Sequence, residues 1–495
     1  MSLVEIKLPN YKECTIDGIK VDPSLVIKHK LLHQELVDKD MTLTKESSSL
    51  RSKLLIGGVL RLINKYTFGT NEKGVELFEF QPVNWRYPTL LVPSNIKKNL
   101  VSKKEKITDY FVVVSFVHWN NKIPIGTITQ SIGTVHDQKN KYDVLLYYYP
   151  QRPITKIKEV NSTLPILSFP EVSNDVYTID PPGCEDIDDA ISFDFEKGRL
   201  GIHIADTTTL TELGTDRYST VYAPHKIVHM VHNDLATNSF SLLQGEKRNV
   251  ITCWINSDLS YEFDRTQIIV KKNLSYDEAE RKMHSIPVLQ KIFEISKVIG
   301  ESLKKDVADT HQMIEVLMIR YNQCMTDYCE SKFGRCIYRN QKLFSKASYS
   351  YENNGHEALG LSKYTHSTSP IRRYADQLIQ KIFINSSIDF DLEKINSFEK
   401  ELNRLYRMWD YLLASQKLVT DKTNEYELEL IEIDDRLTFK CEELKIHITN
   451  KIPLEHKITN NKLFINGQEY TIGQKYKMKL YLIEENYMYK ILIQF

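Results

Sequence analysis

The chain has 495 residues, which is too long for one ordinary core and predicts about three or four domains. Hydrophobic residues make up 41% and charged residues 26%, and the formal net charge is zero. These values are typical of a globular protein and exclude one that binds nucleic acid over its whole surface. No apolar run approaches the ~20 residues of a membrane span, and the N-terminus lacks a signal-peptide layout, so no membrane association is expected.

The cysteines indicate a reducing environment. There are seven, and they show neither a CxxC pair nor the spacing of a zinc finger. An odd number of scattered thiols is typical of proteins without structural disulfides. We therefore expect an intracellular location, with the compartment left open.

The first third of the chain is predicted to hold an extension and two small barrels. Residues 1–52 are polar and are expected to pack on the neighbouring domain. Over residues 53–110, β-branched and aromatic runs broken by Gly57 and Gly58 predict short strands and hairpins, and a second set of runs covers residues 111–171. Two barrels of the OB type are the economical interpretation.

Three aromatic residues of this region have two possible roles. Aromatic rings on an OB-type barrel can stack on bases. Packing in the core or against a hairpin is the more common role. The residues are Trp85, Tyr87 and Trp119.

Four aspartates within ten residues give the strongest chemical signal in the chain. They are Asp180, Asp186, Asp188 and Asp189. Carboxylates this close repel one another, and partial burial raises the cost of keeping them charged. A hard divalent cation such as magnesium removes that cost, because it binds carboxylates, waters and substrate phosphates. Pro181, Pro182 and Gly183 predict a tight turn that brings the first aspartate back toward the other three.

A solvated loop, a calcium loop and a glycosidase site fit the acidic segment less well. Acidic segments are most often solvated loops, but apolar runs flank this one. A calcium loop of the EF-hand type is excluded because Gly183 precedes the aspartate triplet. A glycosidase needs only two separated carboxylates. Cys184 has no paired histidine to make it a nucleophile and is expected to fill the turn. The pattern therefore predicts a metal site for phosphate chemistry.

Strands and helices are both predicted from residue 172 to about residue 422. The segment Arg199–Ile204 is expected to be a central strand. Ser275 and Glu278 have the spacing of a capping box, which marks the start of a helix. Two later apolar stripes have helical period, and the first of them is assigned to the core. They consist of Ile314, Leu317, Met318, Tyr321, Met325 and Tyr328, and of Leu402, Leu405, Trp409, Leu412 and Leu413.

Strand patterns return over residues 423–495. Leu444, Ile446 and Ile448 alternate with polar residues, and Asn466 with Gly467 predicts a type I′ hairpin. A third small barrel is therefore expected at the C-terminal end.

Three segments, in this order, carry a resemblance to a known family. They are Asp180-Pro-Pro-Gly-Cys-Glu-Asp-Ile-Asp-Asp-Ala190, Gly201-Ile-His-Ile-Ala-Asp206 and Tyr364-Thr-His-Ser-Thr-Ser-Pro-Ile-Arg-Arg-Tyr-Ala-Asp376. They resemble successive signatures of the ribonuclease II / ribonuclease R (RNB) family. The Pro-Pro-Gly-Cys form is most similar to the eukaryotic branch, which includes the catalytic exoribonuclease subunit of the exosome.

The resemblance implies an α+β multidomain protein. A mixed α/β RNB nuclease domain over residues 172–422 would be flanked by two N-terminal and one C-terminal β-barrels of the OB type. The implied activity is processive, magnesium-dependent 3′-to-5′ hydrolysis of single-stranded RNA to nucleoside 5′-monophosphates, by a two-metal mechanism. Manganese is the alternative cation, and the catalytic unit is expected to be a monomer.

The resemblance also assigns roles to residues. The four aspartates match family acid positions and are expected to be catalytic, as metal ligands or ligand-orienting groups; which of them bridges two metals stays open. Arg372 matches the arginine that binds the scissile phosphate, and Arg373 offers further donors to RNA. Tyr222 matches a tyrosine that stacks on the terminal base. Glu315 could contact the 2′-hydroxyl, although a solvent-facing helical glutamate is the more common case.

The sequence departs from the family pattern at four places. The stretch between Asp206 and Tyr222 is shortened, and a usual His-Arg is replaced by Gln380 and Lys381. At two positions where the family pattern has glutamate, this chain has Arg407 and Val316. No aspartate is lost, so an active enzyme is expected. The departures keep open a weakened or inactive RNA-binding or scaffold protein with the RNB fold, and a metal-dependent endonuclease is a third hypothesis.

Overall fold

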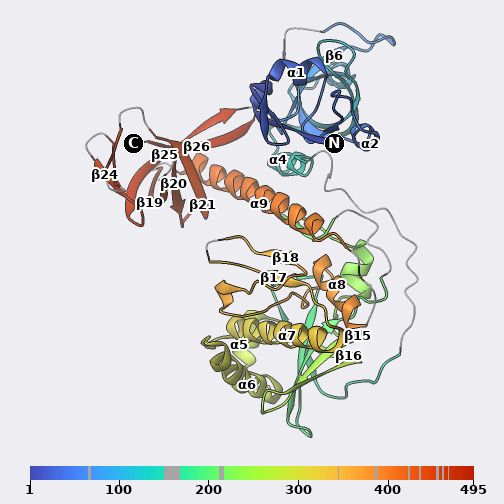
Figure 1. Ribbon diagram of the computed structural model, residues 1–495, viewed down its shortest axis with the longest axis vertical. Helices are drawn as coiled ribbons and strands as arrows, with labels where there is room; N and C mark the ends of the chain where they lie inside the picture. Colours follow the sequence, from blue (N-terminus) through green and yellow to red (C-terminus); the bar gives the residue numbers. More distant parts are fainter. Residues whose placement is uncertain are drawn as a thin grey trace. The chain divides into compact units, whose positions relative to one another are not determined.

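The chain is described here by a computed structural model, drawn in Figure 1. The described residues are 1–64, 68–149, 168–210, 217–343, 345–384, 388, 390–421, 424–433, 436–452, 456–459, 462–465, 468–485 and 487–494. They divide into two compact units. The first unit comprises residues 1–155, 223–225 and 403–495, and the second comprises residues 156–222 and 226–402.

The N-terminal extension is a small sheet with two short helices. Its strands are β1 (Ser2–Leu8), β2 (Glu13–Ile16), β3 (Ile19–Val21) and β4 (Leu36–Val37), in the order β3-β2-β1-β4. The helices are α1 (Pro23–Lys28) and α2 (Lys45–Arg51). The side chains of Val4 and Ile6 share one buried core with Leu54 and Ile56 of the next element. The prediction that the extension packs on its neighbour is thus confirmed.

After the extension, the described residues up to 149 form one closed barrel, where the sequence predicted two. Its strands are β5 (Leu55–Leu60), β6 (Leu77–Pro82), β7 (Leu90–Pro93), β8 (Tyr110–His118) and β9 (Ile125–Thr134), in the order β5-β6-β7-β9-β8. The predicted boundary at residue 110 falls at the start of β8 and is wrong. The breaks between strand runs are connections within a single barrel, and the one before β8 carries helix α3 (Ile96–Ser102).

The three aromatic residues of this region differ in exposure. Tyr87 and Trp119 are buried in the shared core, so they pack. Trp85 is 37% exposed, and the Arg86 guanidinium lies 4.4 Å from the centre of its ring. Of the three side chains, Trp85 has the surface that base stacking requires.

The described residues in the C-terminal part of the first unit form two sheets. The larger has the order β21-β20-β19-β25-β26. Its two edge strands, β21 and β26, lie close to each other. The Asn450 side-chain amide on β21 donates to the Ile493 carbonyl on β26, 3.2 Å away. The predicted hairpin at residues 466 and 467 lies outside the described residues. The strands are β19 (Glu425–Ile433), β20 (Arg436–Cys441), β21 (Ile446–Lys451), β25 (Lys475–Glu485) and β26 (Met488–Gln494), with β22 (His456–Thr459), β23 (Lys462–Ile465) and β24 (Gln468–Thr471) in the smaller sheet.

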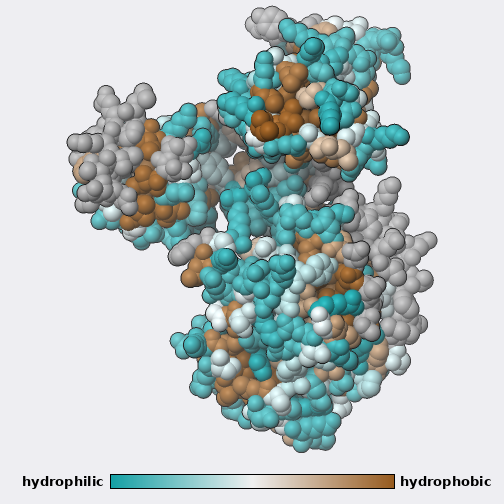
Figure 2. All heavy atoms as spheres, viewed as in Figure 1, coloured by the Kyte–Doolittle hydropathy of each residue, from teal (hydrophilic) through white to brown (hydrophobic). Residues whose placement is uncertain are grey.

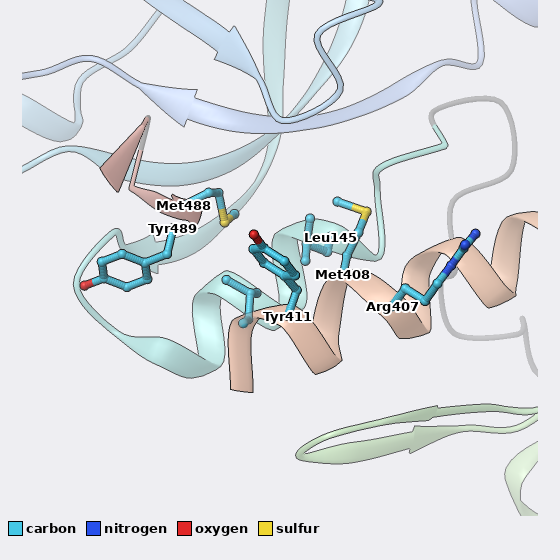
Figure 3. Close-up of a pocket in the computed structure, with 7 residues that line it drawn as sticks. Leu145, Arg407, Met408, Tyr411, Met488 and Tyr489 are labelled. Carbon is cyan, nitrogen blue, oxygen red and sulfur yellow. The ribbon is translucent and has the colours of Figure 1, made fainter. Parts of the chain in front are cut away.

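Helix α9 (Glu393–Thr420) connects these parts of the first unit through its C-terminal half. The Trp409 indole N–H donates to the Tyr142 carbonyl on α4 (Gln138–Leu145), 3.3 Å away. The Tyr411 hydroxyl donates to the Ile491 carbonyl at 2.9 Å. A cavity of about 240 Å³ is lined by Leu145, Arg407, Met408, Tyr411, Leu412, Met488 and Tyr489. Figure 3 shows the Arg407 guanidinium directed away from Met488 and Tyr489.

The second unit is built around another closed barrel. Its order is β10-β11-β12-β15-β16, with β10 and β16 parallel and the other described pairs antiparallel. The predicted central strand is confirmed as β12, between β11 and β15. The strands are β10 (Val176–Asp180), β11 (Asp189–Asp194), β12 (Arg199–Ala205), β15 (Lys247–Ile255) and β16 (Tyr261–Ser275), and two short pairs join β13 (Val221–Ala223) with β14 (Lys226–Val228) and β17 (Tyr338–Asn340) with β18 (Ser348–Ser350).

Helices complete the second unit. They include α5 (Tyr276–Lys282), α6 (Pro287–Leu303), α7 (Thr310–Phe333) and α8 (Tyr374–Phe383), and the first three lie together in Figure 1. The predicted capping box is confirmed, since Ser275 and Glu278 each accept the other's main-chain N–H at 3.2 Å. Most of the predicted stripe on α7 is buried. Glu315 faces solvent on α7 and pairs with Lys305 at 2.6 Å.

The hydrophilic surface and the free thiols are those expected from the composition and the scattered cysteines. Hydrophilic residues cover much of the face seen in Figure 2, with hydrophobic residues in separate patches. Within the described ranges, no helix is long and apolar enough to cross a membrane. The described residues include all seven cysteines, and all seven thiols are free.

Candidate functional site

The four aspartates gather at one end of the barrel in the second unit. Asp180 is the last residue of β10 and Asp189 the first of β11. The turn between them is fixed by a hydrogen bond from the Cys184 N–H to the Pro181 carbonyl, at 3.1 Å. Gly183 has φ 78°, which a type II turn requires at this position. The tight turn predicted from the sequence is therefore confirmed.

Ser241, in the segment before β15, holds the rest of this loop by hydrogen bonds. The Ser241 hydroxyl accepts the Ile187 N–H at 3.1 Å and donates to the Glu185 carbonyl at 2.8 Å. Ile187 and Ile371 belong to one buried hydrophobic cluster. Each isoleucine is next in sequence to a residue of the predicted site, so their packing brings the acidic loop and the arginine pair together.

Asp188 contacts the segment that carries Arg372 and Arg373 through both of its carboxylate oxygens. One carboxylate oxygen accepts the Ile371 N–H at 2.8 Å and the other accepts Arg372 Nε at 2.9 Å. Burial raises the pKa of Asp188 to about 7, although Arg372 and the Ile371 N–H act in the opposite direction. Since both oxygens already have protein donors, Asp188 is better placed to position Arg372 than to bind a cation directly. Of the two roles predicted for it, metal ligand and ligand-orienting group, these contacts favour the second.

Asp186 is contacted from the β13–β14 hairpin. The Tyr222 hydroxyl donates to Asp186 Oδ2 at 2.7 Å, and the Cys184 thiol donates to Oδ1 at 3.7 Å. Tyr222 is still 41% exposed, so part of its ring remains available for stacking. Burial raises the pKa of the Cys184 thiol to about 12, which keeps it protonated and agrees with its predicted role as a turn residue.

Asp180 and Asp189 form the other half of the cluster. Burial raises the pKa of Asp180 to about 6 and that of Asp189 well above its usual range, and neighbouring carboxylates add to both increases, Asp186 for Asp180 and Asp180 for Asp189. Both residues keep some contact with solvent. Among the described residues, the buried Asp180 Oδ2 has no hydrogen-bond partner.

These features fit a hard divalent cation. An unpartnered carboxylate oxygen and two half-buried carboxylates are the kind of oxygen ligands that magnesium or manganese takes. In the part of the chain that the structure describes, no three acidic, histidine or cysteine side chains are placed so that they could hold a metal ion together. Magnesium commonly binds through one or two carboxylates and completes its shell with waters and substrate phosphate. Asp180, whose Oδ2 has no partner among the described residues, and Asp189 are the two carboxylates that would hold it.

The two arginines have different surroundings. Arg372 donates to Asp188 and, at 2.9 Å, to the Ser369 hydroxyl, and its side chain stays 40% exposed. Arg373 pairs with the buried Asp376 at 2.8 Å and donates to His366 Nδ1 at 3.1 Å. Arg372 thus presents donors toward solvent, whereas these bonds direct Arg373 into the protein. This arrangement was not predicted from sequence, where adjacent arginines look alike.

One departure from the family pattern has a structural role. The Gln380 side chain on α8 accepts the main-chain N–H of Thr207 at 2.9 Å and donates to the Ala205 carbonyl at 2.7 Å. Asp206 between them pairs with Arg265 on β16 at 2.7 Å. Gln380 therefore connects α8, through these two hydrogen bonds, to the main chain at the C-terminal end of β12. The shortened stretch after Asp206 lies in part outside the described residues.

One residue near the acids was missed in the sequence. His229, just after β14, places its Nδ1 atom 3.9 Å from Asp186 Oδ2. Its side chain is 4% exposed, and burial lowers its pKa. The sequence holds no spacing signal for this approach, because the hairpin and the acidic loop are far apart along the chain.

Comparisons with known proteins agree with this geometry. Residues 172–292 and 341–385 match the family model described as the RNB domain. Residues 77–149 match the Dis3-like cold-shock domain 2 (CSD2), which crosses the wrongly predicted boundary at residue 110. The resemblance inferred from the three motifs is confirmed.

Curated relatives carry exonuclease names. The probable exosome complex exonuclease RRP44 of Caenorhabditis elegans is 22% identical over 446 residues, covering 60% of this chain and 46% of the relative. The human exosome complex exonuclease RRP44 is 28% identical over 236 residues, covering 42% and 24%. Ribonuclease R of Chlamydia pneumoniae is 25% identical over 316 residues, covering 43% and 47%. The matches span less than half the length of these relatives.

Solved structures share the fold. The apo form of Mycoplasma genitalium RNase R superposes with a TM-score of 0.75 at 17% identity, covering 100% of both chains. Yeast Ssd1, described as a pseudonuclease, gives a TM-score of 0.55 at 14% identity, covering 91% of this chain and 78% of that one. The predicted fold class, a mixed α/β RNB domain with OB-type barrels, is confirmed.

Proposed function

We propose that this chain, which carries an RNB domain and a Dis3-like cold-shock domain, is a metal-dependent 3′-to-5′ exoribonuclease. It would hydrolyse single-stranded RNA processively to nucleoside 5′-monophosphates, with magnesium or manganese as cofactor. The observation that carries the proposal is the acidic loop at the barrel end, joined through Asp188 to Arg372. Support comes from the exonuclease names of the relatives and from Mycoplasma genitalium RNase R, solved in complex with ribose methylated single-stranded RNA.

Different residues of the chain would bind the cation, the phosphate and the base. A divalent cation held by Asp180 and Asp189 would supply an activated water and offset charge on the phosphate. The exposed part of the Arg372 guanidinium would bind phosphate oxygens, in an orientation set by Asp188. The half-exposed Tyr222 ring would stack on a base without regard to sequence, because every base has a π-face.

The fold by itself does not decide whether such a chain is active. Yeast Ssd1, described as a pseudonuclease, shares it. An inactive RNA-binding or scaffold protein is therefore the alternative, and the four aspartates with Arg372 are what favour the enzyme.

Linear and circular forms of one unstructured RNA test the proposal. With magnesium present, the linear form should be converted to nucleoside 5′-monophosphates, resolved by chromatography, while the circle stays intact. Cutting of the circle would indicate an endonuclease. Binding of both forms without cleavage would support the scaffold alternative and contradict the proposed activity.

A further inference from the structure

We propose that Ser369 is a positioning residue for Arg372, and that the buried Asp376 holds Ser369 in place for this role. The inference rests on the proposed function, in which Arg372 binds the phosphate that is cleaved. It gives the guanidinium a second support besides Asp188 and specifies which of its nitrogens is left for the RNA.

The carrying observation is that the Arg372 guanidinium is held at two of its nitrogens. Nε donates to Asp188 Oδ2 and Nη2 donates to the Ser369 hydroxyl, both at 2.9 Å. One bond at Nε would leave the plane of the group free to turn about that bond, and the second bond stops this rotation. Among the described residues, Nη1 makes no hydrogen bond. The two supports therefore leave Nη1 as the nitrogen whose donors are both available to a phosphate oxygen.

Ser369 is in turn held by Asp376. The Asp376 side chain is fully buried, and its Oδ1 atom accepts the Ser369 N–H at 2.7 Å and Arg373 Nη2 at 2.8 Å. The Ser369 carbonyl accepts the Arg373 N–H at 2.9 Å. The backbone of Ser369 is thus fixed by hydrogen bonds at both its N–H and its carbonyl, which places its hydroxyl beside Arg372.

The second oxygen of Asp376 favours a role beyond the stability of this turn. Among the described residues, the buried Oδ2 atom has no hydrogen-bond partner. Buried polar atoms in native proteins are nearly always paired, and exceptions are expected at functional sites. A carboxylate that served only to stabilise the turn would be expected to pair both of its oxygens.

Packing of the turn alone is the competing role for Ser369. In that case its hydroxyl would contribute to stability but not to the rate at which bound RNA is cleaved. Ser367 offers a matched comparison two residues away. It is fully buried, and its hydroxyl donates to Asn322 Oδ1 on α7 at 2.9 Å.

Single-turnover cleavage by the full-length protein separates the two roles. Ser369→Ala should lower the rate about 10–100-fold, which is the effect of losing one hydrogen bond to a charged group in the transition state. The affinity for RNA should change little, and Ser367→Ala should keep the wild-type rate. A wild-type rate in Ser369→Ala would overturn the inference.

A double-mutant cycle shows whether Ser369 acts through Arg372. In the background of Arg372→Lys, Ser369→Ala should cause little further loss of rate, because the Nη2 donor is already absent. The same fold-loss in both backgrounds would contradict the inference.

Two substitutions of Asp376 test its support of Ser369. Asp376→Asn keeps an oxygen that can accept the Ser369 N–H, whereas Asp376→Ala removes it. The asparagine variant should therefore retain most of the rate that the alanine variant loses, although both lose the charge opposite Arg373. Equal rates in the two variants would remove Asp376 from this role.

Arginine-selective ¹⁵N NMR detects the contact without relying on activity. The Arg372 signals are those missing from Arg372→Lys. Separate Nη1 and Nη2 resonances are expected in the wild type, because a bound Nη2 hinders rotation of the group about the Nε–Cζ bond, and they should merge in Ser369→Ala. If this change occurs but the wild type does not degrade RNA, the proposed function fails while the positioning role stands. Merged resonances in the wild type would overturn the inference even if RNA is degraded.

Discussion

The ion pair between Asp188 and Arg372 is the most consequential contact at the scale of single residues. Both carboxylate oxygens accept donors from the arginine segment, at 2.8 and 2.9 Å. The pair joins two motifs that lie far apart in the sequence and sets the direction of a half-exposed guanidinium.

Asp188→Asn should separate RNA binding from hydrolysis. An amide offers one acceptor where the carboxylate offers two, so its NH₂ group must face either the Ile371 N–H or Arg372. We expect RNA affinity to change little and the single-turnover rate to fall about 10²-fold or more, as when a preorganised charge partner is lost. Asp175→Asn, which removes an exposed partner of Lys271, should keep the wild-type rate. A wild-type rate in Asp188→Asn would contradict the role given to this aspartate.

Arg372→Lys should also slow cleavage while preserving charge. A lysine ammonium cannot bind Asp188 and phosphate in the fixed geometry of a guanidinium. Rapid-quench measurement of a bound RNA should show a single-turnover rate about 10²-fold lower. An unchanged rate would remove Arg372 from the phosphate site.

The sequence predicted some residue roles and not others. The aspartates, Arg372 and Tyr222 came from motif positions, and the structure brings them together in the second unit. The inward contacts of Arg373 and the approach of His229 depend on how separate segments pack. Neither leaves a local pattern, so sequence reasoning missed both.

At the scale of elements, strand β12 carries a buried histidine. His203 Nε2 lies 2.8 Å from the Ser192 hydroxyl and Nδ1 lies 2.8 Å from the Thr252 hydroxyl. Burial lowers the pKa of His203 to about 3, below the value of about 6.5 for an unfolded histidine. The unfolded chain therefore binds one more proton between these pH values.

This difference predicts acid sensitivity. Because the folded pKa is depressed, the stabilisation is present above pH 6.5 and is lost as pH falls toward 3, by up to about 1.4 kcal/mol per pH unit. Urea unfolding of the wild type and His203→Gln at pH 7, 6 and 5 measures it. The wild type should lose stability more steeply than the variant. Parallel pH dependence would show that His203 is not held neutral.

Helix α9 gives a second prediction at this scale. Trp409 is 2% exposed and its indole N–H bonds to the Tyr142 carbonyl. Trp409→Ala would leave a large cavity and an unpaired carbonyl, so the free energy of unfolding should fall by about 3–5 kcal/mol. Leu413→Ala, at a 39% exposed position on the same helix, is the control and should cost much less. Equal effects in denaturant titrations would contradict the packing assigned to Trp409.

At the scale of the whole molecule, the sequence predicted the kinds of domain better than their limits. Helical periods, the capping box and the central strand were all confirmed. The prediction from sequence divided the single N-terminal barrel into two domains, because a long connection containing α3 looks like a domain boundary in sequence. Strand pairing between distant segments closes that barrel, and no local pattern reveals such pairing.

The central claim is that a divalent cation among the clustered aspartates enables hydrolysis of RNA from its 3′ end. A 5′-labelled single-stranded RNA, incubated with wild type or Asp189→Asn in magnesium or in chelator, tests it most directly. We predict a ladder that shortens from the 3′ end with wild type and magnesium, and intact RNA in the other three reactions. The same ladder in chelator, or from Asp189→Asn at the wild-type rate, would contradict the claim.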